Sequence, residues 1–254
     1  MVLALHGQPG GGAHFDAIAR LLRPAGFSVL APDRPGWGQR RHEAPRGFAA
    51  NADAAARVLD EAGAERAVVL GYSWGGGVAL ALARLHPARV AGLVLVASVG
   101  PGVTSLADRL LAAPLIGPGL CAGTLLAAHH SLRRSRFRAA WGRGLEALDD
   151  AEVLAIAAAS QGRQSRRSFL VEQRALVREL PAVLSGLGAV TVPACVVAGQ
   201  DDRLLSPATA RRLADAIPGA GLRVVPGAGH LLPVTRPGAV AEAVADVAAR
   251  AGYR

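Results

Sequence analysis

Residues 68–80, VVLGYSWGGGVAL, decide how this chain folds. An apolar run typical of a buried strand leads into a tight turn that carries Ser73, and an apolar helix rich in Ala and Leu follows. Gly71 and Gly75 flank the serine and complete the pattern G-x-S-x-G. Glycine is needed at both positions because so sharp a turn strains the backbone of the serine, and flanking side chains would crowd it. We therefore predict a strand, a serine-bearing turn and a helix, with the hydroxyl lifted clear of the sheet.

The helix predicted after Ser73 also favours a negative charge beside the hydroxyl. The first N–H groups of a helix have no partner inside it, and they lie at the positive end of its dipole. An oxyanion formed on a group bound to Ser73 would sit at this end. A glycine-rich turn with an idle serine is the alternative, and the flanking strand and helix make it the weaker one.

The composition fits one large α/β domain, with or without an insertion. The chain has 254 residues, of which 51% are hydrophobic and only 4% aromatic, so Val, Leu, Ala and Ile must build the core. The formal net charge of +9 comes from arginine alone, since the sequence contains no lysine. These arginines are scattered and lack stacking aromatics beside them, so we expect a small-molecule substrate and no nucleic-acid partner.

The two cysteines, Cys121 and Cys195, lie far apart in apolar surroundings, and we predict buried free thiols. The first residues lack the basic segment and the long apolar run of an export signal, so we expect a cytoplasmic protein. No pattern typical of a cofactor or metal site is evident, and we expect neither.

One uncharged segment, residues 110–128, has about the length of a membrane span. It contains Pro114, Pro118 and three glycines, which interrupt a regular helix. We therefore favour two other interpretations over a span: a lid over an apolar pocket, or a surface that makes peripheral contact with lipid.

Strand and helix signals alternate in the two terminal parts of the chain. Apolar strands are predicted at residues 2–5, 27–31, 66–70, 90–97, 193–198 and 222–225. Their alternation with helices is typical of right-handed βαβ units in a doubly wound, mostly parallel sheet. The alternation stops between residues 100 and 189, where helical segments and a solvated run of arginines replace it. We predict a core formed by residues 1–100 and 190–254, and a helical cap formed by residues 101–189.

Four polar features follow predicted strands, at the edge where active sites of such sheets lie. They are Gln8 in a glycine-rich loop, Ser73, the pair Asp201 and Asp202, and His230. A serine hydroxyl needs a base to take its proton, histidine is the usual base, and a carboxylate fixes the histidine tautomer. The order Ser, Asp, His is the one that this kind of sheet imposes. The pattern alone does not choose between the two aspartates.

Among the seven histidines, only His230 lies in a glycine-flanked loop after a late strand, so we predict it as the base. His6 precedes the glycine-rich loop and is expected to shape it rather than to react. The others, in helical, loop or insertion contexts, are His14, His42, His86, His129 and His130.

These motifs together resemble the α/β-hydrolase superfamily over nearly the whole chain. The matching segments are HGQPG at residues 6–10, GYSWG at 71–75, GQDD at 199–202 and GAGH at 227–230. The resemblance implies that the acid is Asp202, the fourth residue of its glycine-led loop. It also implies an oxyanion hole formed by the backbone N–H groups of Gln8 and Trp74. One such donor stabilises the transition state by about 3–4 kcal/mol.

The chain departs from the family at its start. Members commonly begin with two further strands, and this sequence starts at the strand that precedes His6. We therefore expect residues 27–31 to form an edge of the sheet. An exposed apolar edge strand invites pairing with another chain, so we expect a homodimer partner or a loop to cover it, or the natural chain to start upstream.

The sequence thus predicts a serine hydrolase that acts on a carboxylic ester with an apolar acyl or alcohol group. Three alternatives stay open. A proline-releasing aminopeptidase would need carboxylates in the cap, with Glu146, Asp149, Asp150, Glu152 and Glu172 as candidates. A cofactor-free haloperoxidase-like enzyme would share the triad, whereas a non-catalytic binding module would be expected to lack part of it.

Overall fold

The computed structural model describes residues 1–134 and 150–253, and these residues contain one sheet of six parallel strands. The strands are β1 (Val2–Leu5), β2 (Val29–Leu30), β3 (Ala67–Tyr72), β4 (Val90–Val96), β5 (Ala194–Gly199) and β6 (Gly221–Val225). Their order across the sheet is β2-β1-β3-β4-β5-β6. The predicted doubly wound parallel sheet is confirmed.

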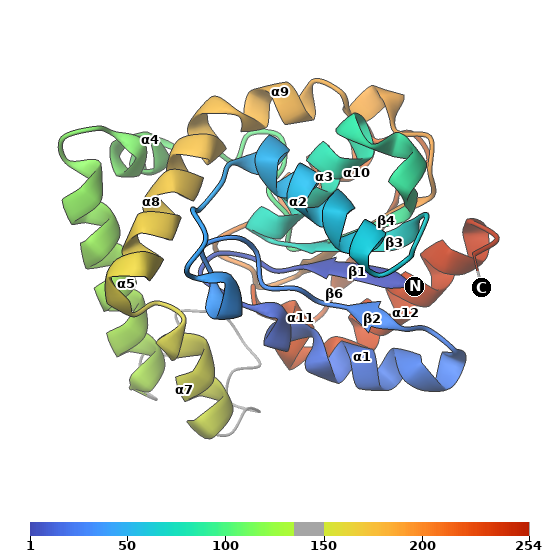
Figure 1. Ribbon diagram of the computed structural model, residues 1–254, viewed down its shortest axis with the longest axis horizontal. Coiled ribbons are helices and arrows are strands. Elements are labelled where there is room, and N and C mark those ends of the chain that lie inside the picture. The colour runs from blue at the N-terminus through green and yellow to red at the C-terminus, as the bar shows by residue number, and fades with distance from the viewer. Residues whose placement is uncertain (135–149, 254) are drawn as a thin grey trace.

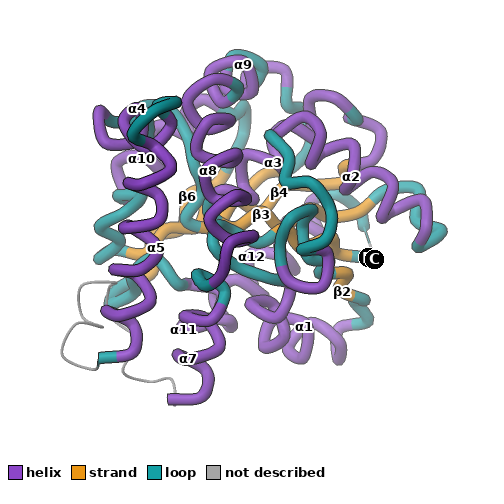
Figure 2. The backbone as a smooth tube through the Cα atoms, turned by 60° about the vertical axis from the view of Figure 1, so that its left-hand side comes forward, coloured by secondary structure: helices purple, strands orange, loops and turns teal. Residues whose placement is uncertain are grey.

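Helices cover both faces of this sheet (Figure 1, Figure 2). One face packs against α2 (Phe48–Glu61), α3 (Trp74–Leu85) and α10 (Pro207–Ala216). The other packs against α1 (Asp16–Leu22), α11 (Leu232–Thr235) and α12 (Pro237–Arg250). Short 3₁₀ helices join these elements at Gly12–Phe15, Arg23–Ala25, Gly38–Arg40, Pro87–Arg89 and Leu187–Ala189.

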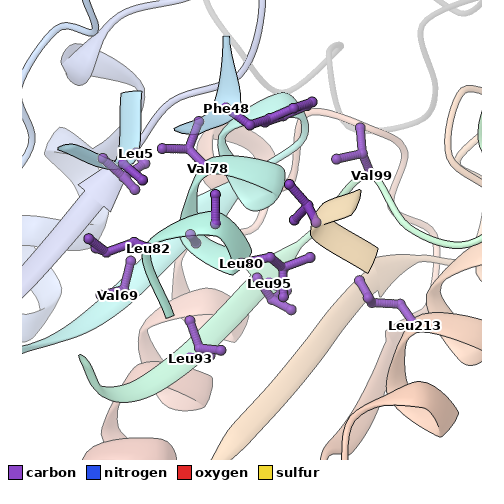
Figure 3. Close-up of a cluster of buried hydrophobic side chains, with 14 of the residues drawn as sticks. Leu5, Phe48, Val69, Val78, Leu80, Leu82, Leu93, Leu95, Val99 and Leu213 are labelled. Carbon is purple, nitrogen blue, oxygen red and sulfur yellow. The ribbon is translucent and has the colours of Figure 1, made fainter. Parts of the chain in front are cut away.

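Successive residues of a strand pack alternately into two separate apolar cores, one on each face of the sheet. In β1, Leu3 and Leu5 belong to the core under α2, α3 and α10, whereas Val2 and Ala4 belong to the core under α1 and α12. Side chains of a strand point alternately to the two faces, so a strand covered on both sides must be apolar throughout. Figure 3 shows the first core, where valines and leucines of the strands meet those of α3 beneath Phe48.

The described residues between β4 and β5 form helices, as expected for this part of the chain. They are α4 (Leu106–Ala112), α5 (Gly117–Arg133), α7 (Asp150–Ala158), α8 (Gly162–Arg178) and α9 (Leu180–Leu184). In Figure 1, α4, α5, α7 and α8 stand together on the side of the molecule away from both termini. The predicted solvated run of arginines comprises Arg133, Arg134, Arg136 and Arg138. Its first two members are exposed to solvent, as predicted, and the last two lie outside the described residues.

No single helix within residues 1–134 and 150–253 combines the length and hydropathy of a membrane span. Helices α4 and α5 pass such a test only as a pair, and they are bent by 114° at the break that contains Pro114. The side chains of Leu115 and Ile116 at this bend are 95% and 50% exposed. Peripheral lipid contact through residues 110–128 stays a prediction.

Strand β2 lies at one edge of the sheet, as predicted for residues 27–31. It is shorter than expected, because only Val29 and Leu30 pair with β1. Both residues are half-buried. So short an edge offers few free backbone groups to another chain.

The turn after β3 has the strained geometry that its glycines predict. Ser73 adopts φ 53° and ψ −119°, a conformation that residues with a side chain rarely take. A Cβ atom on Gly75 would lie 2.1 Å from the carbonyl oxygen of Leu5, and one on Gly71 would lie 2.6 Å from Cα of Gly76. Both contacts are far inside van der Waals distance, so only glycine fits at either position.

We expect Gly75→Ala to destabilise the fold by at least about 2 kcal/mol, because the new methyl group can move only by displacing β1. The matched control is Gly119→Ala in α5, where no atom lies within 4 Å of the added Cβ and alanine is worth about 0.5–1 kcal/mol over glycine. Thermal unfolding of both variants checks this. Equal melting temperatures would contradict it.

Candidate active site

The strand order brings the loops after β1 and β3 together. The chain runs from β1 to β2 on one side and then crosses to β3 on the other side. The helices that follow two such strands lie on opposite faces of the sheet, which leaves a crevice between them at its carboxyl edge. A Cβ atom on Gly7, after β1, would lie only 2.9 Å from Cβ of Ser73, after β3. The glycine-rich loop therefore touches the serine.

The same edge holds the predicted base and acid. Nε2 of His230, in the loop after β6, lies 3.1 Å from Oγ of Ser73. Nδ1 of His230 lies 2.8 Å from Oδ2 of Asp202, in the loop after β5. All three residues are buried. A hydroxyl, an imidazole and a carboxylate thus form one hydrogen-bonded chain, the arrangement needed to activate a serine.

Backbone contacts separate the roles of the two neighbouring aspartates. Oδ1 of Asp202 accepts the N–H groups of Leu204 and Leu205 at 2.8 and 2.9 Å, which fixes the carboxylate toward His230. The backbone N–H of Asp201 donates to the carbonyl oxygen of Ala228 at 2.9 Å and so ties the two loops together. The structure brings Asp202, the residue implied by the family resemblance, to the histidine.

Both predicted oxyanion donors border this site. Trp74 is the first residue of α3, so its N–H has no partner within the helix. Its indole ring stacks on Phe48, with ring centroids 4.1 Å apart and planes 17° apart. Gln8 follows Gly7, whose backbone touches Ser73. The assignment of these two N–H groups as oxyanion donors stays a prediction.

A buried arginine that was not expected from the sequence ties the loops to α8. Arg34 forms an ion pair with Glu172 in which both side chains are almost fully buried. Its Nε donates to the carbonyl oxygen of His6 at 2.8 Å, and a terminal nitrogen donates to that of Gly7 at 3.0 Å. The guanidinium carbon lies 4.5 Å from the centroid of the Trp74 ring. One cation therefore contacts both loops and the helical segment.

Glu172, a candidate for binding a substrate ammonium group, already has partners. It pairs with Arg34 and accepts the indole N–H of Trp37 at 2.8 Å. It is not among the described residues that line the cavity beside Ser73. Of the other candidates, Glu146 and Asp149 lie outside the described residues, and the side chains of Asp150 and Glu152 are not described.

A narrow cavity of about 60 Å³ opens beside Ser73 and His230. Helices α5 and α7 contribute to its lining together with the loops of the sheet. The apolar part of the lining is Pro9, Tyr72, Ala128, Leu132, Ile156, Leu204 and Leu231. None of the described lining residues is Asp, Glu or Arg. The cavity suits a small uncharged molecule with an apolar portion.

The sequence matches the family model of the alpha/beta hydrolase fold over residues 1–237. The chain belongs to this family. It is 31% identical over 236 residues to a 2-hydroxy-6-oxononadienedioate/2-hydroxy-6-oxononatrienedioate hydrolase of Cupriavidus pinatubonensis, covering 90% of this chain and 80% of the relative. It is 28% identical over 263 residues to a pyrethroid hydrolase of Sphingobium wenxiniae, covering 100% of this chain and 89% of that relative.

Solved structures share the same fold. A thermophilic esterase from Thermogutta terrifontis matches with a TM-score of 0.73 and 24% identity, over 98% of this chain and 89% of the esterase. This likeness concerns the fold alone. The sequence relatives are hydrolases, and they identify this α/β-hydrolase as a hydrolytic enzyme.

Two histidines of this hydrolase, one buried and one half-buried, have lowered pKa values and are neutral at pH 7. Burial lowers the pKa of His6 well below its ordinary value, and the Arg34 cation adds to the effect. Nδ1 of His6 donates to the Gly7 carbonyl oxygen at 2.8 Å, and Nε2 accepts the backbone N–H of Arg34 at 2.9 Å. His6 thus shapes the loop, as predicted. Burial also lowers the pKa of His14 to about 4.

His14 is a cavity residue that sequence reasoning missed. It lines the cavity together with Ser73, and its ring lies edge-on to the Tyr72 ring, with ring centroids 6.2 Å apart. Nothing in its local sequence distinguishes it from the other histidines in helices and loops.

The His14 pKa predicts a loss of stability in acid. Between its native pKa of about 4 and its ordinary value of 6.5, the unfolded chain binds more protons than the native one. Stability therefore falls as the pH drops through this range, by at most about 3 kcal/mol. Urea unfolding from pH 6.5 to pH 4 should show a smaller loss for His14→Gln than for the wild type. The control is the exposed His42→Gln, which should keep the wild-type dependence. Identical curves for His14→Gln and the wild type would contradict the prediction.

Proposed function

We propose that this hydrolase cleaves a small carboxylic ester with an apolar acyl or alcohol group through a covalent acyl-enzyme. The observation that carries the proposal is the 3.1 Å distance between Oγ of Ser73 and Nε2 of His230. At this distance a histidine takes the hydroxyl proton directly, with no intervening water.

In the proposed reaction, Oγ of Ser73 attacks the ester carbonyl carbon while Nε2 of His230 takes the hydroxyl proton. The N–H groups of Gln8 and Trp74 donate to the oxyanion of the tetrahedral intermediate. His230 then gives the proton to the departing alcohol, which leaves the acyl group on Ser73. A water molecule, deprotonated by His230, attacks this acyl group. The acid is released and Ser73 recovers its proton.

Asp202 is the proposed partner that orients the base. A carboxylate has only acceptors, so its contact with Nδ1 requires the N–H at that nitrogen and leaves Nε2 free to accept the serine proton. It also stabilises the imidazolium formed during attack. The two loop N–H groups on its other oxygen support this role by holding the carboxylate in place.

We propose that residues 101–189 act as the cap that selects the substrate, over a core of residues 1–100 and 190–254. Support comes from Ala128 and Leu132 of α5 and Ile156 of α7, which line the cavity beside the serine. A cytoplasmic location belongs to the same proposal, and the free thiols of Cys121 and Cys195 support it. We also propose peripheral lipid contact through the exposed Leu115 and Ile116. A second copy of the chain would pair at the edge strand β2 through the few free backbone groups of Val29 and Leu30.

The uncharged lining favours an ester over the substrate of an aminopeptidase. An ammonium group buried beside Ser73 would need a carboxylate partner, and the described lining offers none. A haloperoxidase-like enzyme would use the same three residues, so an assay for peracid formation from acetate separates it from an esterase.

We expect Ser73→Ala to lower the turnover of short p-nitrophenyl esters by at least about 10⁴-fold, because the nucleophile is lost. A serine-directed phosphonate should add its mass to the wild type at Ser73 and leave the variant unlabelled. Unchanged turnover in Ser73→Ala would sink the enzymatic proposal. A wild type that neither turns over esters nor takes the label would indicate a binding module.

We expect Asp202→Asn to lower kcat by about 10⁴-fold, because the amide stabilises the wrong histidine tautomer. The matched control is Asp201→Asn, one residue earlier in the same loop, which should stay within a few-fold of the wild type. Steady-state kinetics on one ester measure both. If Asp201→Asn causes the larger loss, the assignment of the acid is wrong.

A further inference from the structure

Three residues that line the cavity beside Ser73 each carry a buried polar atom without a hydrogen-bond partner among the described residues. These atoms are Oε1 of Gln8, Nδ1 of His14 and Oγ of Ser160. Buried polar groups in folded proteins are nearly always paired, because an unpaired one loses its hydration and gains nothing. The gathering of three such atoms beside one nucleophile indicates that a bound molecule supplies their partners.

The Gln8 amide has only one orientation that its neighbours allow. Oδ2 of Asp108 accepts from Ser105, and its Oδ1 accepts Nε2–H of Gln173 at 3.0 Å. Oε1 of Gln173 therefore faces Gln8 and accepts its Nε2–H at 2.9 Å. Since a carboxylate can only accept, the direction of every bond in this chain is fixed. Oε1 of Gln8 is left as an acceptor on a residue of the cavity lining, and it requires a donor.

The other two atoms match a neutral polar group. His14 is uncharged at pH 7 because burial lowers its pKa, so each ring nitrogen offers either one proton or one lone pair. The hydroxyl of Ser160, which is 5% exposed, can donate or accept. A hydroxyl or an amide N–H on the ligand can donate to Gln8. A ligand hydroxyl can also accept a hydrogen bond from His14 or Ser160.

The rest of the cavity defines the remainder of the ligand. Leu132, Ile156, Leu204 and Leu231 supply an apolar wall, and the described lining carries no Asp, Glu or Arg. A charged ligand would lose its hydration without gaining a counter-ion. The matching molecule is small, uncharged and apolar apart from one donor group.

We propose that the ester cleaved by Ser73 carries a hydroxyl or N–H group that donates to Oε1 of Gln8, and that Gln8, His14 and Ser160 select for it. The inference rests on the proposed function and narrows its substrate class to hydroxy- or amido-substituted esters. Gln173 acts as a positioning residue, since it holds the amide of Gln8 without lining the cavity.

The test compares esters that differ by one group. The p-nitrophenyl esters of 2-hydroxypropanoate and 3-hydroxybutanoate are each paired with the ester that has a methyl group in place of the hydroxyl. A second set carries the hydroxyl on the alcohol side. Each kcat/KM is divided by the rate constant for hydrolysis of the same ester by hydroxide, which corrects for differences in the intrinsic reactivity of the esters. We expect at least one pair to favour the hydroxyl ester by about tenfold or more, the worth of one buried hydrogen bond.

Variants test the assignment through the ratio of kcat/KM for the hydroxyl ester to kcat/KM for its methyl partner. Effects of a substitution on folding or on the oxyanion hole change both values and cancel in this ratio. The ratio should fall toward one in Gln8→Leu and in Ser160→Ala, and Gln173→Leu should lower it by releasing the Gln8 amide. The matched control is Gln39→Leu, the same change at an exposed site outside the cavity lining, which should keep the wild-type ratio.

The outcomes separate this inference from the proposed function. Hydrolysis that depends on Ser73 but has ratios near one in every wild-type pair overturns the inference and leaves the esterase proposal standing. A preference that survives in Gln8→Leu and Ser160→Ala overturns the assignment of these residues. Absence of Ser73-dependent hydrolysis with any ester overturns both proposals.

Discussion

The packing of the Ser73 turn against the end of β1 is the constraint on which the rest of the structure depends. The space at Gly75 that a side chain would fill is taken by the Leu5 carbonyl oxygen, so β1 and β3 can be neighbours only if that residue is glycine. This neighbourhood sets the point at which the strand order reverses, and hence the crevice. The proposed acid, Asp202, and the proposed base, His230, follow β5 and β6 at the same edge. The steric requirement at Gly75 thus sets the contact between β1 and the Ser73 turn, to which the loops after β5 and β6 add their side chains.

The buried Arg34 adds the second level of organisation. A buried ion pair contributes little net stability, because the loss of hydration offsets the attraction of the charges. The contacts of Arg34 instead have direction: they run to Glu172 of α8, to the carbonyl oxygens of His6 and Gly7, and to the face of Trp74. These contacts fix how the helical segment meets the two loops that border the serine.

The sequence predicted the parts of this arrangement that are encoded locally. Strands covered on both faces are apolar runs, and the turn at Ser73 shows itself by the spacing of its glycines. The choice of Asp202 over Asp201 came from the family resemblance, because adjacent residues share one pattern. The places of His14 and Ser160 in the cavity were not predictable. They depend on how the segment between β4 and β5 packs on the core, and no local signal carries that information.

Gln8 has two proposed roles, one for its backbone N–H and one for its side-chain amide. In the proposed reaction its peptide N–H donates to the oxyanion, while its side-chain amide donates to Gln173 of α8, which in turn donates to Asp108 of α4. A substitution at Gln8 that changes the substrate range would therefore also change the rate of ester hydrolysis. Diversification is easier on the helices that close the other walls, such as those bearing Leu132 and Ile156, where replacements leave the reacting groups alone.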